Sequence, residues 1–249
     1  MKSKITTAVI LAAGLGARLK HHTEDQPKGF LEIDGRSLIE RSITILVQKG
    51  ITEIIIGTGY LHEHFNSLKQ KFPVITFRNE DYSTSGSMYT LYVLQHLIKG
   101  QFLLLESDLL YDPVSIDYLM NDTRADIVLA SGATRSGDEV YIQSSPEGTL
   151  QQMSKDRNLL SHIDGELVGI SKLSLATLKG MTSFSETHFK KGDRMMNYED
   201  ALVGVSIKHP IHIMVIQDLV WCEIDDENHL QRALGLIYPK IVQRIEKYD

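Results

Sequence analysis

Two glycines and two cationic residues near the start of the chain form a pattern that could bind a row of phosphate groups. In "TAVILAAGLGARLK", residues 7–20, an apolar run ends in small residues and is followed by Gly14, Gly16 and Arg18. About ten residues later, "QPKGF" supplies Lys28. Glycines allow tight turns and present backbone N–H groups to anionic oxygens. Because two cations are costly to crowd together, Arg18 and Lys28 beside one glycine loop favour a polyanion between them.

Two other phosphate-binding loops do not fit this stretch. The dinucleotide fingerprint requires a third glycine, and Leu19 stands where it would be. The phosphate loop of ATPases requires Gly-Lys followed by Ser or Thr, which the stretch lacks. Alone, the glycines would indicate an ordinary turn, and each cation a solvated surface residue. The prediction of a phosphate site therefore rests on their combination.

Acidic residues follow two other apolar runs and could hold a metal ion beside those phosphates. "FLLLESDLLYD" ends its run in Glu106-Ser107-Asp108, and "WCEIDDEN" places Asp225 as the first acid after its run. In open parallel α/β sheets, ligands bind at the carboxyl ends of the strands. Mg²⁺ is usually held by one or two carboxylates together with phosphate oxygens. The alternative for Asp108 is a turn or helix-capping residue, and Glu227 suits the start of the last helix.

Strand and helix patterns alternate over the first 130 residues or so. Strand-length apolar runs are "TAVILAA", "EIIIGT", "VITFR", "FLLLES" and "DIVLAS". Helical spacing predicts helices over "RSLIERSITILVQKG", closed by Gly50, and over "SMYTLYVLQHLIKG", closed by Gly100. A third helix opens in "YDPVSIDYLMND", with Asp112 as its cap and Pro113 at its first position. This alternation predicts a mostly parallel sheet covered on both faces.

The second half of the chain is less regular. "EVYIQ", "TLQQMS" and "NLLSHI" are predicted as short strands, "GELVGISKL" as a longer one, and "IHIMVI" with "VWCEID" as a late pair. "SFSETHFKKGDRMMN" is predicted as a loop that could be mobile, and a long amphipathic helix begins at about Glu227. With no linker or repeat, we expect one domain over residues 1–249, with halves of about 1–130 and 131–249.

The pattern Leu-Ala-Ala-Gly-x-Gly-x-Arg-Leu, followed about ten residues later by Pro-Lys, is similar to the signature of a nucleotidyltransferase family. That family joins nucleoside triphosphates to sugar 1-phosphates, phosphocholine and related phosphoesters. Further matches along the chain are "SGSMYTLY", "LLLESD", "GELVGIS", "NYEDAL" and "CEIDDENHLQRA". Together they resemble most the family's small cytidylyltransferases. These include enzymes that act on phosphocholine and enzymes that act on 2-aminoethylphosphonate, and the resemblance to the second group is closer.

The resemblance implies a fold and a set of site residues. The implied fold is α/β and Rossmann-like, of the nucleotide-diphospho-sugar transferase type. Its central sheet would be mixed but mostly parallel, with helices on both faces. The first half would bind the nucleotide through Leu11, Ala12, Ala13, Gly14, Gly16, Ser85, Gly86, Ser87 and Ser107. Arg18, Lys28 and Lys155 would act on the phosphates, and Asp108 and Asp225 would hold Mg²⁺. The alternatives are an ordinary helix cap for Ser85 or Ser87, and a surface lysine for Lys155.

The implied reaction is in-line attack by an acceptor phosphonate or phosphate oxygen on the α-phosphorus of CTP, with pyrophosphate leaving. That oxygen is already anionic at neutral pH, so the cations and the metal act by positioning and charge rather than through a general base. The choice of cytosine over uracil rests on the resemblance alone. A non-catalytic nucleotide-binding module is the alternative from another class, although a pure binder could lose Lys28, Asp108 or Asp225.

Two acid-rich stretches in the second half are candidates for binding the other end of the acceptor. "SGDEVYI" and "NYEDAL" contribute Asp138, Glu139, Tyr141, Tyr198, Glu199 and Asp200. A quaternary choline head favours aromatic faces, whereas a primary ammonium donates hydrogen bonds and favours carboxylates. The acids therefore favour 2-aminoethylphosphonate, for phosphonate decoration of cell-surface lipid or glycan, over phosphocholine. The alternative for "NYEDAL" is a capped helix start with solvent-facing acids.

Composition limits the partners. A net charge of −6 over 249 residues disfavours a nonspecific nucleic-acid binder. No apolar run approaches the ~20 residues of a membrane span, so no membrane insertion is expected. Cys222 is the one cysteine, which suits a packed side chain in a reducing cytoplasm. His62 and His64 are two apart in a helical pattern and so point apart, which disfavours zinc. The expected partners are CTP and a small zwitterionic phosphonate or phosphoester, and a homodimer is possible.

Overall fold

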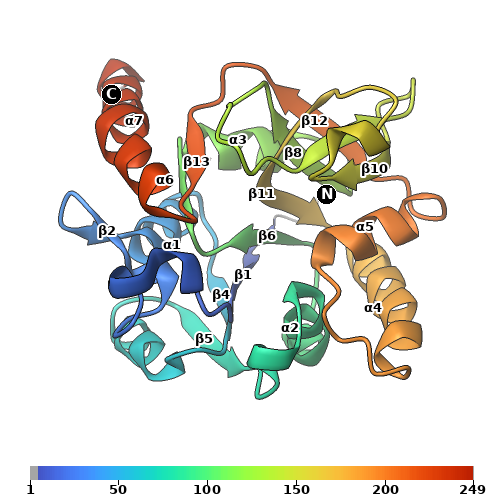
Figure 1. The fold of residues 1–249 in the computed structure, drawn as a ribbon, viewed down its shortest axis with the longest axis horizontal. Coiled ribbons are helices and arrows are strands. Elements are labelled where there is room, and N and C mark those ends of the chain that lie inside the picture. The colour runs from blue at the N-terminus through green and yellow to red at the C-terminus, as the bar shows by residue number, and fades with distance from the viewer. Residues whose placement is uncertain (1–4, 249) are drawn as a thin grey trace.

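The first half of the chain forms the parallel part of a nine-stranded sheet (Figure 1). The computed structural model describes residues 5–248. Strands β6 (Phe102–Glu106), β1 (Thr7–Ala12), β4 (Glu53–Thr58) and β5 (Val74–Arg78) are neighbours in this order and run parallel. All four strands therefore end at the same edge of the sheet, where the glycine loop follows β1.

The second half of the chain continues the sheet beyond β6. Strand β11 (Gly165–Leu173) pairs antiparallel with β6 and then branches to two further pairs of strands. One pair is β8 (Ile127–Ser131) with β12 (His212–Ile216), and the other is β9 (Tyr141–Ser144) with β10 (Leu150–Ser154). Strands β10 and β11 run against the others of this sheet, which confirms the expected mixed, mostly parallel arrangement.

Helices cover both faces of the sheet because successive strand side chains point to opposite faces. In β1, Ala8 and Ile10 belong to one apolar cluster, and Val9 and Leu11 to another. The first cluster is covered by α1 (Leu38–Gln48), α3 (Val114–Asn121) and the 3₁₀ helix His62–Gln70. The second is covered by α2 (Ser87–Leu94), α4 (Leu175–Phe189) and α5 (Tyr198–Ser206).

A third apolar cluster joins the end of the chain to its N-terminal part. It includes residues of β2 (Glu32–Ile33), β7 (Leu109–Tyr111), β13 (Trp221–Glu223), α6 (Glu227–Arg232) and α7 (Tyr238–Tyr248). Strand β3 (Arg36–Ser37) pairs with β2. Leu19 and Leu31, from either side of Lys28, pack in this cluster with Ile224. Figure 1 shows α6 and α7, in red, on the same side of the molecule as β2 and α1, in blue.

The predicted helix ends are partly confirmed. Gly50, with φ +89°, follows α1 as expected. Helix α3 begins one residue later than expected, with Pro113 rather than Asp112 as its N-cap residue, although the Asp112 carboxylate accepts the Val114 N–H. The expected stop at Gly100 is wrong. Helix α2 ends at Leu94 and a 3₁₀ turn runs over Gln95–Leu97, so Gly100 lies beyond both.

Three predictions for the second half are wrong. "NLLSHI" is not a strand, because the Asp156 carboxylate accepts the Asn158 N–H and stabilises a 3₁₀ turn over Arg157–Leu159. The predicted loop "SFSETHFKKGDRMMN" is wrong for its first seven residues, which form the end of α4, with Phe184 and Phe189 packed against the second cluster. The late strands do not pair with each other, since β12 joins β8 in the large sheet and β13 pairs with β7 in a separate one.

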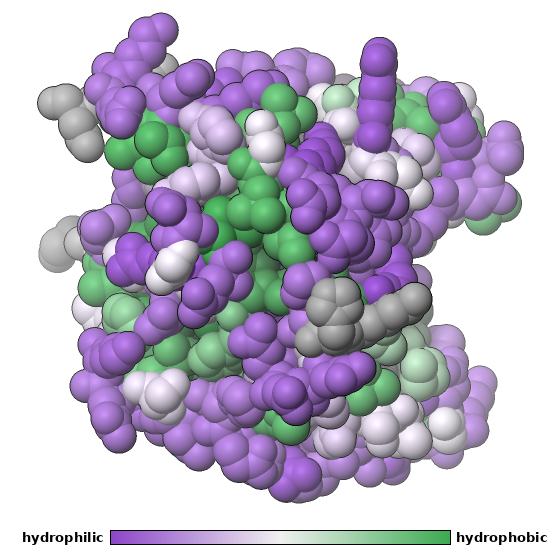
Figure 2. Space-filling model, turned by 60° about the vertical axis from the view of Figure 1, so that its left-hand side comes forward, coloured by the Kyte–Doolittle hydropathy of each residue, from purple (hydrophilic) through white to green (hydrophobic). Residues whose placement is uncertain are grey.

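Figure 2 shows one face covered mainly by hydrophilic residues, with hydrophobic residues gathered near its centre. Within residues 5–248, no helix has both the length and the apolar character needed to cross a bilayer.

A buried lysine links β11 to the end of α3, and its replacement should destabilise the fold. Lys172 is 2% exposed, and its ammonium donates to the carbonyl oxygens of Leu119 at 2.9 Å and Asp122 at 3.0 Å. Because Lys172→Met removes these donors from carbonyls that stay buried, we expect the free energy of unfolding in urea to fall by about 2 kcal/mol. The exposed Lys179→Met on α4 should change it by less than about 0.5 kcal/mol. Equal losses would contradict this role.

Candidate active site

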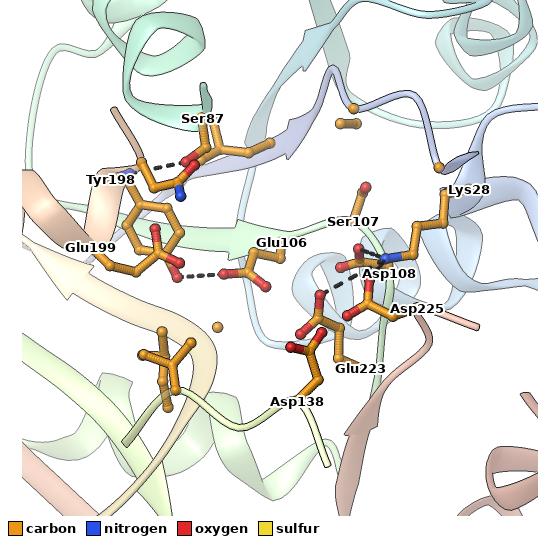
Figure 3. Close-up of a pocket in the computed structure, with 18 of the residues that line it drawn as sticks. Lys28, Ser87, Glu106, Ser107, Asp108, Asp138, Tyr198, Glu199, Glu223 and Asp225 are labelled. Carbon is orange, nitrogen blue, oxygen red and sulfur yellow. Dashed lines mark hydrogen bonds and ion pairs between the residues drawn. The ribbon is translucent and has the colours of Figure 1, made fainter. Parts of the chain in front are cut away.

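A cavity of about 560 Å³ lies at the carboxyl ends of β1 and β6. It is also lined by the middle of β11, the start of α5 and the end of β13. Every predicted site residue lines it except Tyr141 and Asp200. Figure 3 shows Lys28 pointing toward Asp108 and Asp225, with Tyr198 and Glu199 across the cavity beyond Glu106.

The glycine loop forms one wall and is held close to Lys28. Gly16 has φ +64°, and a Cβ there would lie 3.3 Å from both Lys28 Cβ and Thr23 Cγ2. The Thr23 hydroxyl donates to the Gly16 carbonyl oxygen at 2.9 Å and fixes the turn. Gly14 has no heavy atom within 4 Å of the Cβ it lacks. Gly16 is therefore required by the fold, whereas Gly14 leaves the wall open to the cavity.

Lys28 lies at the centre of the site and is shared by the two predicted metal ligands. Its ammonium is 2.5 Å from Asp108 Oδ2 and also hydrogen-bonds Asp225 Oδ1. Burial lowers the pKa of Lys28, but the carboxylates of Asp108, Glu223 and Asp225 outweigh it, so the pKa is raised and the amine stays charged. Gly29 allows this approach, because a Cβ there would lie 3.1 Å from the Ser107 carbonyl oxygen.

Pairing of two short strands brings Asp225 to Asp108. Strands β7 and β13 are antiparallel, with Leu109 opposite Glu223. The Ile224 N–H donates to the Asp108 carbonyl oxygen at 3.1 Å, so the next residue, Asp225, lies beside Asp108. Buried residues of the third cluster, among them Leu110, Ile224 and the free thiol of Cys222, support this pairing from behind.

Two glutamates that the sequence analysis left unassigned complete an acidic cluster. Glu106, Asp108 and Glu223 each offer a carboxylate oxygen, and these oxygens lie within 4.8 Å of one another. Each glutamate stands two residues before a predicted aspartate, in Glu-x-Asp, and residues two apart in an extended chain share a side. The repeated Glu-x-Asp was therefore a signal available in the sequence.

The acidic cluster fits a hard divalent cation. Burial and the neighbouring carboxylates raise the pKa of Glu106 to about 8 and that of Glu223 to about 10. Asp108 Oδ1 is buried without a hydrogen-bond partner among the described residues. Oxygen ligands with surplus negative charge suit Mg²⁺, which binds through one or two carboxylates plus phosphate oxygens.

The other two predicted cations meet at Asp138. Arg18 contacts Asp138 Oδ2 through Nη1 and Asp225 Oδ1 through Nη2, each at 2.8 Å. Lys155 Nζ lies 2.6 Å from Asp138 Oδ1. Although burial acts to raise it, the hydrogen bonds from Lys155 and Arg18 hold the pKa of Asp138 well below its usual range. Arg18, Lys28 and Lys155 therefore line one cavity, as predicted, each already paired with carboxylates.

The far wall is built by the start of α5. The Tyr198 hydroxyl donates to Glu106 Oε1 at 2.6 Å, and its N–H donates to Ser87 Oγ at 2.9 Å. Glu199 Oε2 is buried and has no hydrogen-bond partner among the described residues. Burial, with the charge of Asp200 added, raises the pKa of Glu199 to about 7. An unpaired buried acceptor of this kind is suited to a donor on a ligand.

Asp200 and Tyr141 lie outside the cavity. The Asp200 carboxylate accepts the Asn197 N–H at 3.0 Å and completes a capping box, so the solvent-facing, capping alternative holds for Asp200 and not for Glu199. The Tyr141 hydroxyl donates to Glu139, a lining residue, at 3.3 Å.

Neither Ser85 nor Ser87 caps helix α2, so the capping alternative is wrong for both. The N-cap residue is Gly86, Ser85 accepts from Asn79, and Ser87 accepts from Tyr198. Gly86 is required because the chain at Met195 and Met196 crosses it. A Cβ there would lie 2.4 Å or less from both of their carbonyl oxygens.

Several other lining residues carried no local sequence signal. The His229 ring, on α6, lies 3.2 Å from the Ser136 carbonyl oxygen through Nε2, and Glu166, on β11, accepts the Thr134 N–H at 2.7 Å. Both contacts join distant parts of the chain, so neither could be read from spacing.

Comparison with known proteins places the chain among nucleotidyltransferases. The sequence profile of the MobA-like NTP transferase domain matches residues 8–170. The choline-phosphate cytidylyltransferase of Streptococcus pneumoniae is 29% identical over 201 residues, 81% of this chain and 84% of that protein. The 2-aminoethylphosphonate cytidylyltransferase of Lancefieldella rimae is 26% identical over 223 residues, 86% of this chain and 88% of that protein. Among solved structures, CTP:phosphocholine cytidylyltransferase from S. pneumoniae (LicC) matches with a TM-score of 0.79 and 24% identity, covering 93% of this chain and 99% of that one.

A glycine in β11 makes room for Glu106, and its replacement should disturb the acidic cluster. Gly169 has φ +79°, and a Cβ there would lie 2.9 Å from the Glu106 carboxyl carbon. Gly148 has φ +74° but open space around it, so Gly148→Ala adds only the backbone strain, about 1 kcal/mol. Because the methyl group of Gly169→Ala would also push Glu106 off Tyr198, we expect a further loss of about 1 kcal/mol in urea unfolding. Equal losses for the two variants would contradict this packing.

Proposed function

Because this chain belongs to the MobA-like NTP transferase family, a family of nucleotidyltransferases, we propose that it is a cytidylyltransferase that joins CTP to a small phosphonate or phosphate acceptor. The observation that carries the proposal is the Lys28 ammonium between Asp108 and Asp225, beside the glycine loop. Three cations and an acidic cluster in one cavity match the needs of a metal-bound triphosphate. A nucleotide-binding module without activity would not require this set.

The nucleotide is proposed to lie along the glycine loop. Leu11 to Gly16 would face the base and phosphates, with Ser107 nearby. Gly86 and Ser87, at the start of α2, would contact the base or ribose. Arg18 and Lys28 would bind the phosphates. The resemblance to cytidylyltransferases supports CTP over UTP.

Asp108, with Glu106 and Glu223, would hold Mg²⁺, and Asp225, which shares the Lys28 ammonium with Asp108, would be a further ligand. When bound there, Mg²⁺ would neutralise charge on the triphosphate and on the departing pyrophosphate. The role of Lys28 is then to keep Asp108 and Asp225 together and to contribute a fixed positive charge at the same place.

The reaction is a substitution at the α-phosphorus of CTP. An anionic oxygen of the acceptor forms the new bond to this phosphorus. The bond to the oxygen bridging the α- and β-phosphates breaks, and its electron pair leaves with pyrophosphate. Because the attacking oxygen is already anionic, no residue needs to remove a proton. Arg18, Lys28 and Lys155 lower the barrier by holding two anions in contact and in line.

We propose 2-aminoethylphosphonate as the acceptor, because Glu199 offers an unpaired buried oxygen in the cavity. A primary ammonium donates three hydrogen bonds, so it can satisfy this oxygen. Phosphocholine is the second candidate, supported by the aromatic rings of Tyr82, Tyr198 and Trp221 in the lining. Its quaternary head cannot donate a hydrogen bond to Glu199.

Pyrophosphate release measures the proposed activity directly. The protein would be incubated with Mg²⁺, either CTP or UTP, and one acceptor from 2-aminoethylphosphonate, phosphocholine, phosphoethanolamine and glucose 1-phosphate. We expect release with CTP and 2-aminoethylphosphonate at the highest kcat/KM. No release with any pair would contradict the cytidylyltransferase proposal, and a preference for phosphocholine would contradict only the choice of acceptor.

Loss of the central ammonium should abolish most of the activity. Lys28→Met leaves Asp108 and Asp225 without the positive charge between them and removes a phosphate contact. We expect kcat/KM for CTP to fall by about 10² to 10³, with circular dichroism checking that the fold is retained. Lys71→Met, at a lysine that pairs with Glu40 outside the cavity, is the control and should keep full activity. Wild-type turnover by Lys28→Met would refute the assigned role.

The neighbouring acids Glu199 and Asp200 allow a matched test of the acceptor site. Because Glu199→Gln removes a charged acceptor from the cavity wall, we expect the KM for 2-aminoethylphosphonate to rise about tenfold or more while the KM for CTP stays unchanged. Asp200→Asn loses a helix cap and should lower stability by about 1 kcal/mol without changing either KM. If the two variants had the same acceptor KM, Glu199 would not bind the ammonium.

A further inference from the structure

Six side chains of the cavity form one chain of ion pairs in which the charges alternate. In order of contact these are Asp108, Lys28, Asp225, Arg18, Asp138 and Lys155. They come from distant parts of the sequence and link the glycine loop to the segment after β10. The end with Asp108, Lys28 and Asp225 belongs to the acidic cluster. The other end depends on Asp138.

Asp138 binds its two cations as a phosphate group would. One carboxylate oxygen is 2.8 Å from Arg18 Nη1 and the other is 2.6 Å from Lys155 Nζ. Carboxylates and phosphates present pairs of oxygens with similar geometry to such donors. Asp138 is only 23% exposed, whereas the side chains of Arg18 and Lys155 are each 58% exposed and have room to change partners.

We propose that Asp138 is a positioning residue that occupies the phosphate contacts of Arg18 and Lys155, and that the incoming triphosphate displaces it. The inference rests on the proposed function, from which it takes the chemical class of the ligand, a polyphosphate. It also revises the expectation that Asp138 binds the acceptor. Asp138 keeps two flexible cations at the site between turnovers, and this lowers the affinity for the polyphosphate. After displacement, the Asp138 carboxylate lies near the bound anion and is repelled by it. This repulsion favours the return of Asp138 to Arg18 and Lys155 when pyrophosphate leaves.

Glu139 provides a matched control for charge. It lines the same cavity, but its carboxylate accepts from the Gly137 N–H and the Tyr141 hydroxyl, and no ion pair to a cation is formed by it among the described residues. Glu139→Gln therefore removes one negative charge from the rim without freeing Arg18 or Lys155. Asp138→Glu keeps the charge and is the conservative variant.

Binding of inorganic tripolyphosphate tests the proposal without any need for turnover. Affinity would be measured by calorimetry and by the fluorescence of Trp221, the one tryptophan, which lines the cavity. We expect Asp138→Asn to bind tripolyphosphate about three- to tenfold more tightly than the unmodified protein, since two partly exposed ion pairs no longer compete. Asp138→Glu and Glu139→Gln should change the affinity less than about twofold. In turnover, Asp138→Asn should lower the KM for CTP without raising kcat.

The outcomes separate this proposal from the proposed function. Unchanged or weaker tripolyphosphate binding by Asp138→Asn would overturn the displacement, and a merely structural role would give that weaker binding. Equal tightening by Glu139→Gln would also overturn it, because a general charge effect would then suffice. If no acceptor were turned over but Asp138→Asn still bound tripolyphosphate more tightly, the cytidylyltransferase proposal would fail and the role of Asp138 would stand.

Discussion

The site depends on one electrostatic constraint: buried carboxylates from two strand ends surround the ammonium of Lys28. Removing several carboxylates from water is costly unless positive charge and hydrogen bonds compensate them. Lys28 compensates Asp108 and Asp225, but burial and mutual repulsion still raise the pKa of Glu106 and Glu223. The protein groups alone therefore leave this edge of the sheet short of positive charge, which is the condition that a divalent cation relieves.

Strand pairing, the third apolar cluster and two glycines hold Lys28 and the carboxylates together. Antiparallel pairing of β7 and β13 sets Asp225 beside Asp108, and the third apolar cluster packs the last helices against the loop that carries Lys28. Close approach then requires Gly29 against Ser107 and Gly169 against Glu106. Each of these contacts joins segments far apart in the chain, so the C-terminal part of the chain is as necessary to the site as the glycine loop.

Much of this was predictable from the sequence where the signal was local. The glycine loop, Arg18 and Lys28 lie within one short stretch, and apolar runs marked the strands whose ends meet at the cavity. The predictions that failed concern features that depend on contacts between residues far apart in the chain. Spacing could not show that β13 pairs with β7, or that Asp200 caps a helix while its neighbour Glu199 faces the cavity. The Glu-x-Asp repeat was visible, but its meaning required knowing that the two copies meet.

A crystal structure of the protein with CTP and Mn²⁺, in which anomalous scattering locates the metal, tests the central claim most directly. The account predicts a manganese peak in contact with Asp108 and with Glu223 or Asp225. It also predicts triphosphate oxygens on the same ion and the Lys28 ammonium beside the phosphates. Manganese bound away from these carboxylates, or a nucleotide bound outside the cavity, would contradict it.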